Sequence, residues 1–136
     1  MVEIIKKKQL GNFKDARGIL LWASPTLLNF DYKYLTMGSI EPGCYRGSHY
    51  HKKTLEQFMC IEGTLICYMD EETTTLAPGD VVEIPVNSVH TFTNESEKTA
   101  YFIEFKNSEF DKNDPDIYPV VTEPSKRLTG GSARKP

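Results

Sequence analysis

This chain of 136 residues contains few cysteines, no excess of basic charge and no long apolar stretch. The three cysteines, Cys44, Cys60 and Cys67, are an odd number without C-x-x-C spacing, which is typical of free thiols in a reducing compartment. No segment has the length of apolar sequence that a bilayer span needs, and the first ten residues contain no apolar core of a secretion signal. We therefore expect a cytoplasmic protein that makes no membrane contact.

An excess of positive charge is also missing, because 16 basic residues stand against 19 acidic ones and the net charge is -3. The lysines and arginines form no basic stripe, so a nucleic-acid partner is not expected. The length suits one domain that can bury a core of its own.

Helical patterning is absent from most of the chain, since no long segment places apolar residues at a spacing of 3.6 between capping residues. Short segments rich in aromatic and β-branched residues occur instead, separated by Gly, Pro and Asp turn signals. Expected strands cover residues 2–5, 32–40, 56–61, 64–69, 80–84 and 99–105, and the turn DARG at 15–18 leads into the apolar run ILLW. This pattern predicts an all-β sandwich or jelly-roll barrel.

Three regions of different composition follow one another along the chain. Residues 1–106 carry the strand pattern and are the expected barrel. Residues 107–121 are polar and contain prolines, which predicts an extended strap, and the basic, glycine-rich residues 122–136 predict a flexible tail. The expected strand that follows Glu56 is apolar on both faces, which predicts a second sheet or a partner chain against its back.

All three histidines lie in two short stretches, residues 43–63 and 79–94. His49 and His51 are two positions apart, so both point to one face of a strand. A turn then brings Glu56 alongside on the next strand, and His90 joins from a third. Three imidazoles and one carboxylate form a mixed shell for one divalent ion such as Zn, Fe, Mn or Ni. The alternative is a pocket in which the same imidazoles carry protons or donate hydrogen bonds without a metal.

These stretches resemble the two motifs of the cupin family. The first, G-x5-H-x-H-x4-E-x6-G, is matched in register by Gly43, His49, His51, Glu56 and Gly63. The second, G-x5-P-x-G-x2-H-x3-N, is matched by Gly79, Pro85, His90 and Asn94. Asn87 replaces its second glycine, and asparagine tolerates the positive φ that the turn requires. The resemblance implies a single-domain cupin, which is a double-stranded β-helix or jelly-roll barrel.

A finer resemblance comes from RGSHYHKK at 46–53 together with the DARG turn. The combination is similar to nucleotide-sugar cupins: 3,5-epimerases, 3,4-ketoisomerases, and the C-terminal cupin of capsular-polysaccharide epimerase-reductases. The last group carries a metal, and the ketoisomerases usually lack the glutamate, so Glu56 favours the metal site. The resemblance implies an epimerase or ketoisomerase that acts on a nucleotide-linked 4-keto sugar in surface-polysaccharide biosynthesis. It also implies a homodimer.

Residue roles follow from that expectation. Arg17, Arg46 and Lys52 are the candidate substrate-binding residues, because a guanidinium matches phosphate geometry; for the arginines a surface salt bridge is the alternative. The candidate base is His49 or His51 if no metal binds. If those imidazoles hold a metal, Tyr101, Glu104, Lys52 or a metal-bound hydroxide takes that role.

Two other functions remain open on the sequence. Three histidines and a glutamate also hold iron or nickel in cupin dioxygenases, so an oxygenase or lyase acting on a small acid is one alternative. A sugar-binding cupin without enzymatic activity is the other, since one barrel hosts many functions.

Overall fold

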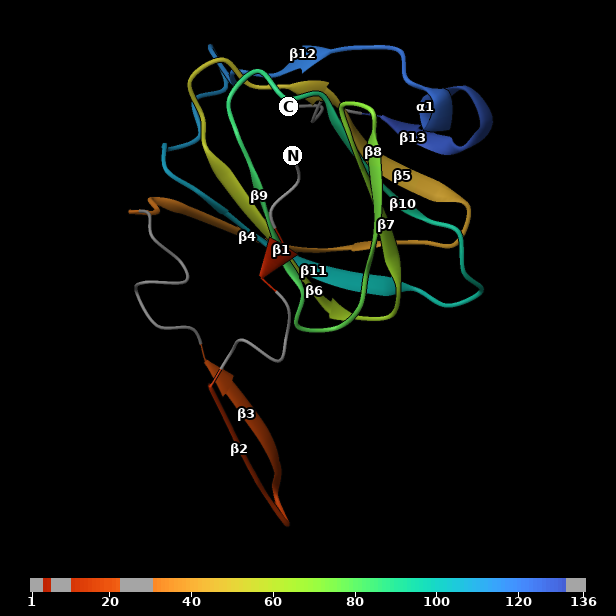
Figure 1. Cartoon of the computed structure of the whole chain (residues 1–136). Coiled ribbons are helices and arrows are strands. Elements are labelled where there is room, and N and C mark those ends of the chain that lie inside the picture. Colours follow the sequence, from red (N-terminus) through yellow and green to blue (C-terminus); the bar gives the residue numbers. More distant parts are fainter. Residues whose placement is uncertain (1–3, 6–10, 23–30, 132–136) are drawn as a thin grey trace.

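The chain folds into a small barrel made of two facing sheets, with a separate hairpin beside it (Figure 1). The structure is a computed structural model that describes residues 4–5, 11–22 and 31–131. One sheet has the order β1 (Ile4–Ile5), β9 (Val81–Ile84), β6 (Glu56–Glu62), β11 (Ala100–Lys106) and β4 (Tyr34–Ile40). The other has the order β12 (Tyr118–Pro119), β5 (Cys44–Tyr50), β10 (His90–Asn94), β7 (Leu65–Met69) and β8 (Glu72–Leu76). The expected all-β jelly-roll barrel is confirmed.

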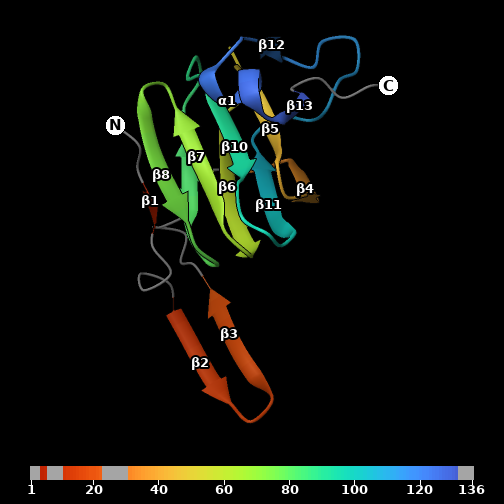
Figure 2. The same cartoon turned by 90° about the vertical axis from the view of Figure 1, so that its right-hand side faces the viewer.

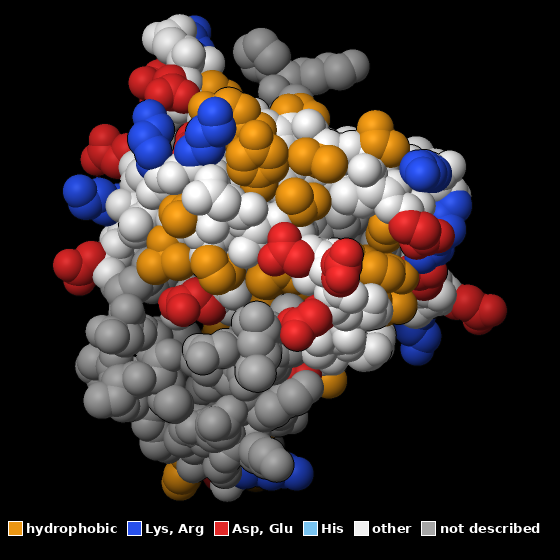
Figure 3. Space-filling model, turned by 45° about the horizontal axis from the view of Figure 1, so that its top comes forward, with side chains coloured by type: hydrophobic (Ala, Val, Ile, Leu, Met, Phe, Trp, Pro, Cys, Tyr) orange, Lys and Arg blue, Asp and Glu red, His pale blue; other side chains and the backbone are white. Residues whose placement is uncertain are grey.

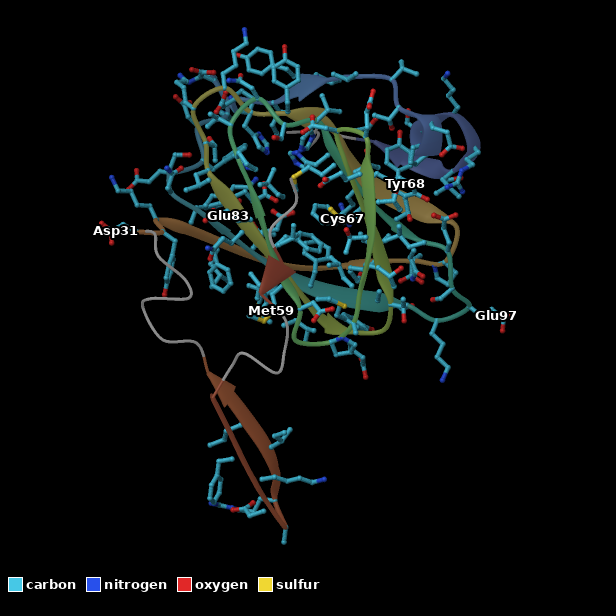
Figure 4. All side chains as sticks on the ribbon, viewed as in Figure 1. Asp31, Met59, Cys67, Tyr68, Glu83 and Glu97 are labelled. Carbon is cyan, nitrogen blue, oxygen red and sulfur yellow. The ribbon has the colours of Figure 1, made fainter. Side chains whose placement is uncertain are left out.

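The core lies between the inner faces of the two sheets. On β11 the even-numbered residues Ala100 and Phe102 are buried, whereas Tyr101 is 45% exposed on the outer face. Phe58 of β6 lies between Phe92 of β10 and Phe102, with ring centroids 3.6 and 4.7 Å apart. These stacked rings form an apolar layer across the barrel, and Cys67 lies in the same interior (Figure 4).

Strand β6 is apolar on both faces, as the sequence suggests, but the two faces have different surroundings. Phe58 and Cys60 face the second sheet and are fully buried. Ile61, on the back of the strand, is 42% exposed in the described structure. The second sheet therefore covers the inner face of β6.

The turn before His90 has the conformation that its sequence predicts. Asn87 adopts φ 67°, the left-handed region that asparagine tolerates better than other non-glycine residues. Its amide donates to the carbonyl of His51 at 2.6 Å, so this turn also fastens the end of the loop that carries a candidate ligand.

The hairpin formed by β2 (Gly11–Asp15) and β3 (Gly18–Trp22) extends away from the barrel in both ribbon views (Figures 1 and 2). The expected DARG turn connects its two strands, and the Arg17 guanidinium pairs with Asp15 at 2.6 Å. Among the described residues, no helix is long and apolar enough to cross a membrane.

The C-terminal region is more ordered than the composition of residues 122–136 suggests. Helix α1 (Glu123–Arg127) is followed by β13 (Thr129–Gly131), which pairs with β5 in parallel. Thr122 and Ser125 form a capping box, and Pro124 is buried at the start of the helix. The expectation of a flexible tail is therefore wrong for residues 123–131, while residues 132–136 lie outside the described ones.

A polar cluster fastens α1 to the barrel. Arg127 donates to Glu95 at 2.6 Å and to the hydroxyl of Tyr68 at 2.9 Å, and Tyr68 in turn donates to Glu95. The hydrogen bond from Arg127 is the main reason that the pKa of Glu95 falls to about 2.

Replacing Arg127 by methionine should lower the midpoint of thermal unfolding by about 2 °C at pH 7, a small effect because solvent screens the pair. The pKa of Glu95 is depressed in the folded state, so its contribution is present above pH 4.5 and is lost as the pH falls toward 2. The difference between wild type and Arg127→Met should therefore shrink at pH 3. Lys126→Met, one position earlier, is the control; an equal effect of both variants would exclude the cluster as the cause.

Candidate metal centre and its cavity

A β-bulge in β5 sets the direction of the first histidine. His90 pairs with His49, but the next residue, Thr91, pairs with Gly47, so Ser48 is an extra residue on β5. Ser48 has φ 62° and Gly47 has φ 100°. A Cβ at Gly47 would lie 2.7 Å from the carbonyl oxygen of His90, so only glycine lets the two strands approach this closely.

The three imidazoles meet at one end of the barrel. Their ring centroids are 4.6 Å apart for His49 and His90, 4.8 Å for His49 and His51, and 5.0 Å for His51 and His90. One nitrogen from each lies within 4.8 Å of the others. His51 and His90 are each 1% exposed, so this convergence takes place away from bulk water.

Backbone carbonyls orient two of the rings. Nδ1 of His90 lies 3.0 Å from the carbonyl of Ser88, and Nδ1 of His51 lies 2.8 Å from the carbonyl of Asp116. A carbonyl can only accept, so Nδ1 of each ring carries a proton, and Nε2 of His90 keeps a lone pair. Nε2 of His51 instead faces the carboxylate of Glu56, and a proton shared between them would leave when a metal binds. Nε2 of His90 is buried without a hydrogen-bond partner among the described residues, and so is Nδ1 of His49. Buried polar atoms of this kind normally have a partner, and a metal ion would provide it.

Glu56 completes the arrangement from the start of β6. The carboxylate is 2% exposed, and Oε1 lies 3.2 Å from Nε2 of His51. Two ligands of one ion at bonds of about 2.1 Å are about 3.0–3.4 Å apart, so this separation fits a shared ion. The four candidate ligands, His49, His51, Glu56 and His90, are thus adjacent, as the two motifs imply.

Charge states in the site also suit a cation. Burial, together with the neighbouring His90 and His51, lowers the pKa of His49 to about 3, and burial lowers the pKa of His90. Burial opposes ionisation of Glu56, but the hydrogen bond with His51 and the charge of Lys106 outweigh it and lower its pKa to about 2. Metal ligands must be neutral imidazoles and ionised carboxylates, so His49, His90 and Glu56 fit a divalent ion. Burial opposes protonation of His51, but the hydrogen bond with Glu56 and its charge outweigh burial and raise the pKa of His51. A divalent ion would therefore have to displace the proton that these two share.

A cavity of about 500 Å³ opens beside the histidines. Phe92 and Phe102 give it an apolar wall. Its other lining residues include His49, His90, Glu56, Arg46, Glu104 and Lys106. An end that carries the candidate metal ligands, an apolar wall and three further charged side chains, Arg46, Glu104 and Lys106, can hold a small polar molecule with one oxygen near the histidines.

Two of the remaining predicted site residues reach this cavity. Glu104 faces inward on β11, and its side chain is 15% exposed. Arg46 lines the cavity from β5, where its Nε donates to the carbonyl of Ser39 at 3.0 Å.

The structure does not bring the other three to the cavity. Tyr101 points outward, because odd-numbered residues of β11 face away from the core. Arg17 lies on the projecting hairpin with its side chain 86% exposed. Lys52 places its ammonium 4.3 Å from the ring centre of Tyr118, outside the cavity lining. The interior face of a strand could be read from alternation, but the paths of the hairpin and of the loop after β5 could not.

Sequence reasoning missed two residues of the site. Lys106 continues the inward series of β11 after Glu104, so strict alternation could have found it. Asp116 lies in the strap, and its carboxylate accepts from the amides of Lys52, Lys53 and Thr54 at 2.8–2.9 Å. No local sequence pattern predicts this contact, because it joins residues more than 60 positions apart.

Comparison with solved structures gives three informative neighbours. The capsular polysaccharide assembling protein CapF of Staphylococcus aureus superposes with a TM-score of 0.61 and 25% identity, over 83% of this chain and 33% of CapF. A 3,4-ketoisomerase from Helicobacter canadensis gives a TM-score of 0.75 at 17% identity, over 92% and 95% of the two chains. QdtA, a sugar 3,4-ketoisomerase from Thermoanaerobacterium thermosaccharolyticum, gives 0.73 at 18% identity, over 93% of both chains. At these lower identities the two ketoisomerases support the fold alone.

Sequence comparison adds quercetin 2,3-dioxygenase of Bacillus subtilis (strain 168), which is 33% identical over 72 residues. The match covers 52% of this chain and 21% of the dioxygenase, so the chain spans about a fifth of that relative. The family model described as Cupin_2, a cupin domain, matches residues 36–106 and includes both histidine motifs. The chain therefore belongs to the cupin family.

Proposed function

We propose that this cupin is a metal-dependent epimerase or ketoisomerase that acts on a nucleotide-linked 4-keto sugar. The supporting observation is the convergence of His49, His51 and His90 beside Glu56, at the end of a cavity that also contains Glu104. Such a cavity offers a cation site and a separate carboxylate, the two groups that proton transfer next to a ketone requires.

His49, His51, His90 and Glu56 would hold the ion. When bound, it supplies Lewis acidity toward a keto oxygen, which makes the neighbouring C–H more acidic. The imidazoles are then occupied as ligands, so they are not free bases. Glu104 is the candidate base that faces the cavity, whereas Tyr101 does not reach it. Glu104 takes the proton from the carbon beside the ketone, and a proton returns to the opposite face of that carbon or to the adjacent carbon.

The walls of the cavity orient the substrate. Phe92 and Phe102 exclude water from one side of the sugar. Arg46 lines the cavity and has guanidinium N–H groups beyond the one that binds Ser39, so it is placed to receive the phosphates. Neighbours support this choice: one QdtA structure is described as a complex with TDP, and CapF is described as assembling capsular polysaccharide.

Solvent isotope exchange tests the proposal. A nucleotide-linked 4-keto-6-deoxy sugar incubated with the metal-loaded protein in D₂O should gain deuterium beside the ketone, which NMR detects. Glu104→Gln should slow exchange by at least about 100-fold, the usual contribution of a positioned base. Glu62→Gln, on the exposed end of β6, is the matched control. Metal-free protein that exchanges at the full rate would exclude the Lewis-acid mechanism.

A dioxygenase acting on a small acid is the second candidate. The curated relative with 33% identity over 72 residues is described as a quercetin 2,3-dioxygenase, and three imidazoles with a carboxylate are also an iron or nickel ligand set. Oxygen uptake on adding a substrate under air, with no deuterium incorporation into a keto sugar, would replace the isomerase proposal with this one. Saturable sugar binding with neither reaction would favour a sugar-binding cupin without enzymatic activity.

We also infer a homodimer in the cytoplasm. The outer face of the β4–β11–β6 sheet exposes Leu35, Met37, Ile61 and Tyr101, and the projecting hairpin exposes Phe13, Ile19 and Leu20. Two exposed apolar surfaces on one chain suit pairing with a second copy. The cysteines are free, which suits a reducing compartment.

Tyr101→Asp should therefore convert a dimer into a monomer, because a charge on the outer face would be buried without a partner. Light scattering coupled to size exclusion gives the mass. Thr75→Asp, exposed on β8 of the other sheet, should leave the mass unchanged. A wild-type protein with the mass of one chain would refute the dimer.

A further inference from the structure

Lys106 is a charged residue of the cavity that lies outside both histidine motifs and has no role in the proposed proton transfer. It is the last residue of β11 and follows Phe102 and Glu104 on the inward face. Its side chain is only 15% exposed, although lysine rarely lies this deep without a partner. The ammonium group therefore belongs to the interior of the cavity and not to its outer surface.

The contacts of Lys106 leave hydrogen-bonding capacity unused. Nζ lies 3.9 Å from Oε1 of Glu56 and 3.7 Å from Oε2 of Glu104, and 5.9 Å from the ring centre of Tyr34. Both ion pairs exceed the usual hydrogen-bond length of about 2.7–3.2 Å. An ammonium has three N–H donors, so Lys106 is attracted to both carboxylates without being hydrogen-bonded to either.

An exposed lysine that lies outside the cavity makes a different kind of contact. Lys53 on the outer surface bonds to Asp114 at 2.8 Å, a close and direct pair. Lys106 is far less exposed, yet it stands farther from both carboxylates and next to open cavity volume. Because Nζ is not hydrogen-bonded to either carboxylate, its N–H groups can donate to the oxygen of a ligand in the cavity.

The charges in the cavity indicate the charge of the ligand that fits it. Glu56 and Glu104 carry two negative charges, whereas Arg46, Lys106 and a divalent ion carry four positive ones, so the occupied site has a net charge of about +2. A low-dielectric cavity favours a ligand that cancels this charge. The matching ligand is therefore an anion, such as a carboxylate or an enediolate.

We propose that Lys106 forms an anion subsite beside the metal centre, which holds the anionic oxygen of a small molecule whose neighbouring oxygen faces the histidines. The ligand class is therefore a compound with oxygens on adjacent carbons, such as an α-hydroxy acid or the enediolate of a hydroxy ketone. The metal-facing half of this inference rests on the proposed function, and it defines the part of the substrate that reacts. The anion subsite itself depends on Lys106 and not on the metal.

Glycolate, which has a carboxylate next to a hydroxyl, is the probe. Cobalt-loaded protein is titrated with glycolate while its visible absorption is followed, and the metal-free protein is titrated in a calorimeter. Lys106→Met should weaken glycolate binding about 10- to 100-fold, the usual loss for one charge-assisted hydrogen bond. Lys106→Arg should restore most of it. Cobalt affinity should stay equal or rise in Lys106→Met, because a nearby positive charge is removed.

Lys52→Met is the control, since Lys52 lies outside the cavity lining and should not affect glycolate binding. Equal glycolate affinity in wild type and Lys106→Met, or no binding by wild type at tens of millimolar glycolate, would overturn the subsite. A joint loss of cobalt and glycolate affinity in Lys106→Met would instead show a structural role and also overturn it. If the protein binds no cobalt but binds glycolate through Lys106, the subsite stands and the metal-dependent function falls.

Discussion

Replacing His90 by alanine is expected to reduce the metal content of the purified protein from about one divalent ion per chain to nearly none. Nε2 of His90 is buried without a partner among the described residues, and the carbonyl of Ser88 fixes its proton on Nδ1. Losing one ligand should lower affinity by more than about 100-fold, since residues that only orient ligands already contribute 10- to 100-fold. Elemental analysis of protein purified without an affinity tag gives the metal content.

A control variant separates this effect from damage to the core. Cys60→Ala also removes a fully buried side chain, but from β6 and away from the imidazoles, so it should keep its metal. His90→Gln keeps most of the volume of the ring and should still lose the metal. If His90→Ala retained a full complement of metal, the three-histidine centre would be wrong, whatever the activity of the variant.

Replacing Asp116 by alanine should have the largest effect on stability among the strap residues. Its carboxylate accepts from the amides of Lys52, Lys53 and Thr54 and from the hydroxyl of Thr54, all at 2.8–2.9 Å. These bonds hold the loop between His51 and Glu56 in shape. Their loss should lower the free energy of unfolding by about 2–4 kcal/mol, measured by urea denaturation.

The same substitution should lower metal affinity by about 10- to 100-fold. The backbone carbonyl of Asp116 accepts from Nδ1 of His51, and it would shift once the side chain no longer holds the strap against the loop. Asp116 adopts φ 54°, so alanine would additionally strain the backbone there. Asp116→Asn tolerates that φ and keeps one acceptor oxygen, so it should lie between the two. Asp114→Ala, an exposed neighbour on the same strap, is the matched control. Equal effects at positions 114 and 116 would show that the carboxylate of Asp116 does not hold this loop in place.

The stabilisation that the carboxylate of Asp116 provides should decrease at low pH. Burial opposes ionisation of Asp116, but hydrogen bonds from the loop amides outweigh it and lower its pKa below 3.8. A carboxyl group with a depressed pKa in the folded state stabilises the protein above its unfolded value and loses that contribution as the pH falls through the folded value. The stability difference between wild type and Asp116→Ala should therefore persist at pH 5 and decline only below about pH 3.8.

Much of the barrel could be predicted because its signals are local. Alternating apolar residues in β11 identify the inward Phe102 and Glu104 and the outward Tyr101, and the outer position of Tyr101 already conflicts with a catalytic role. The turn at Asn87 follows from its tolerance of positive φ. The order in the C-terminal tail could not be predicted in the same way. Its helix depends on the burial of Pro124 and on the pairing of β13 with β5, and composition does not encode these contacts.

The spacing of two histidines, a glutamate and a third histidine determined by itself which side chains form the centre, because strand periodicity and turn length are properties of neighbouring residues. Only the tertiary structure decided what surrounds them. It excluded Arg17 and Lys52 from the cavity, and it brought Lys106 beside Glu56 and Asp116 behind His51. The reason is physical: these placements depend on how distant segments pack against one another, and packing is a property of the closed barrel rather than of any single stretch.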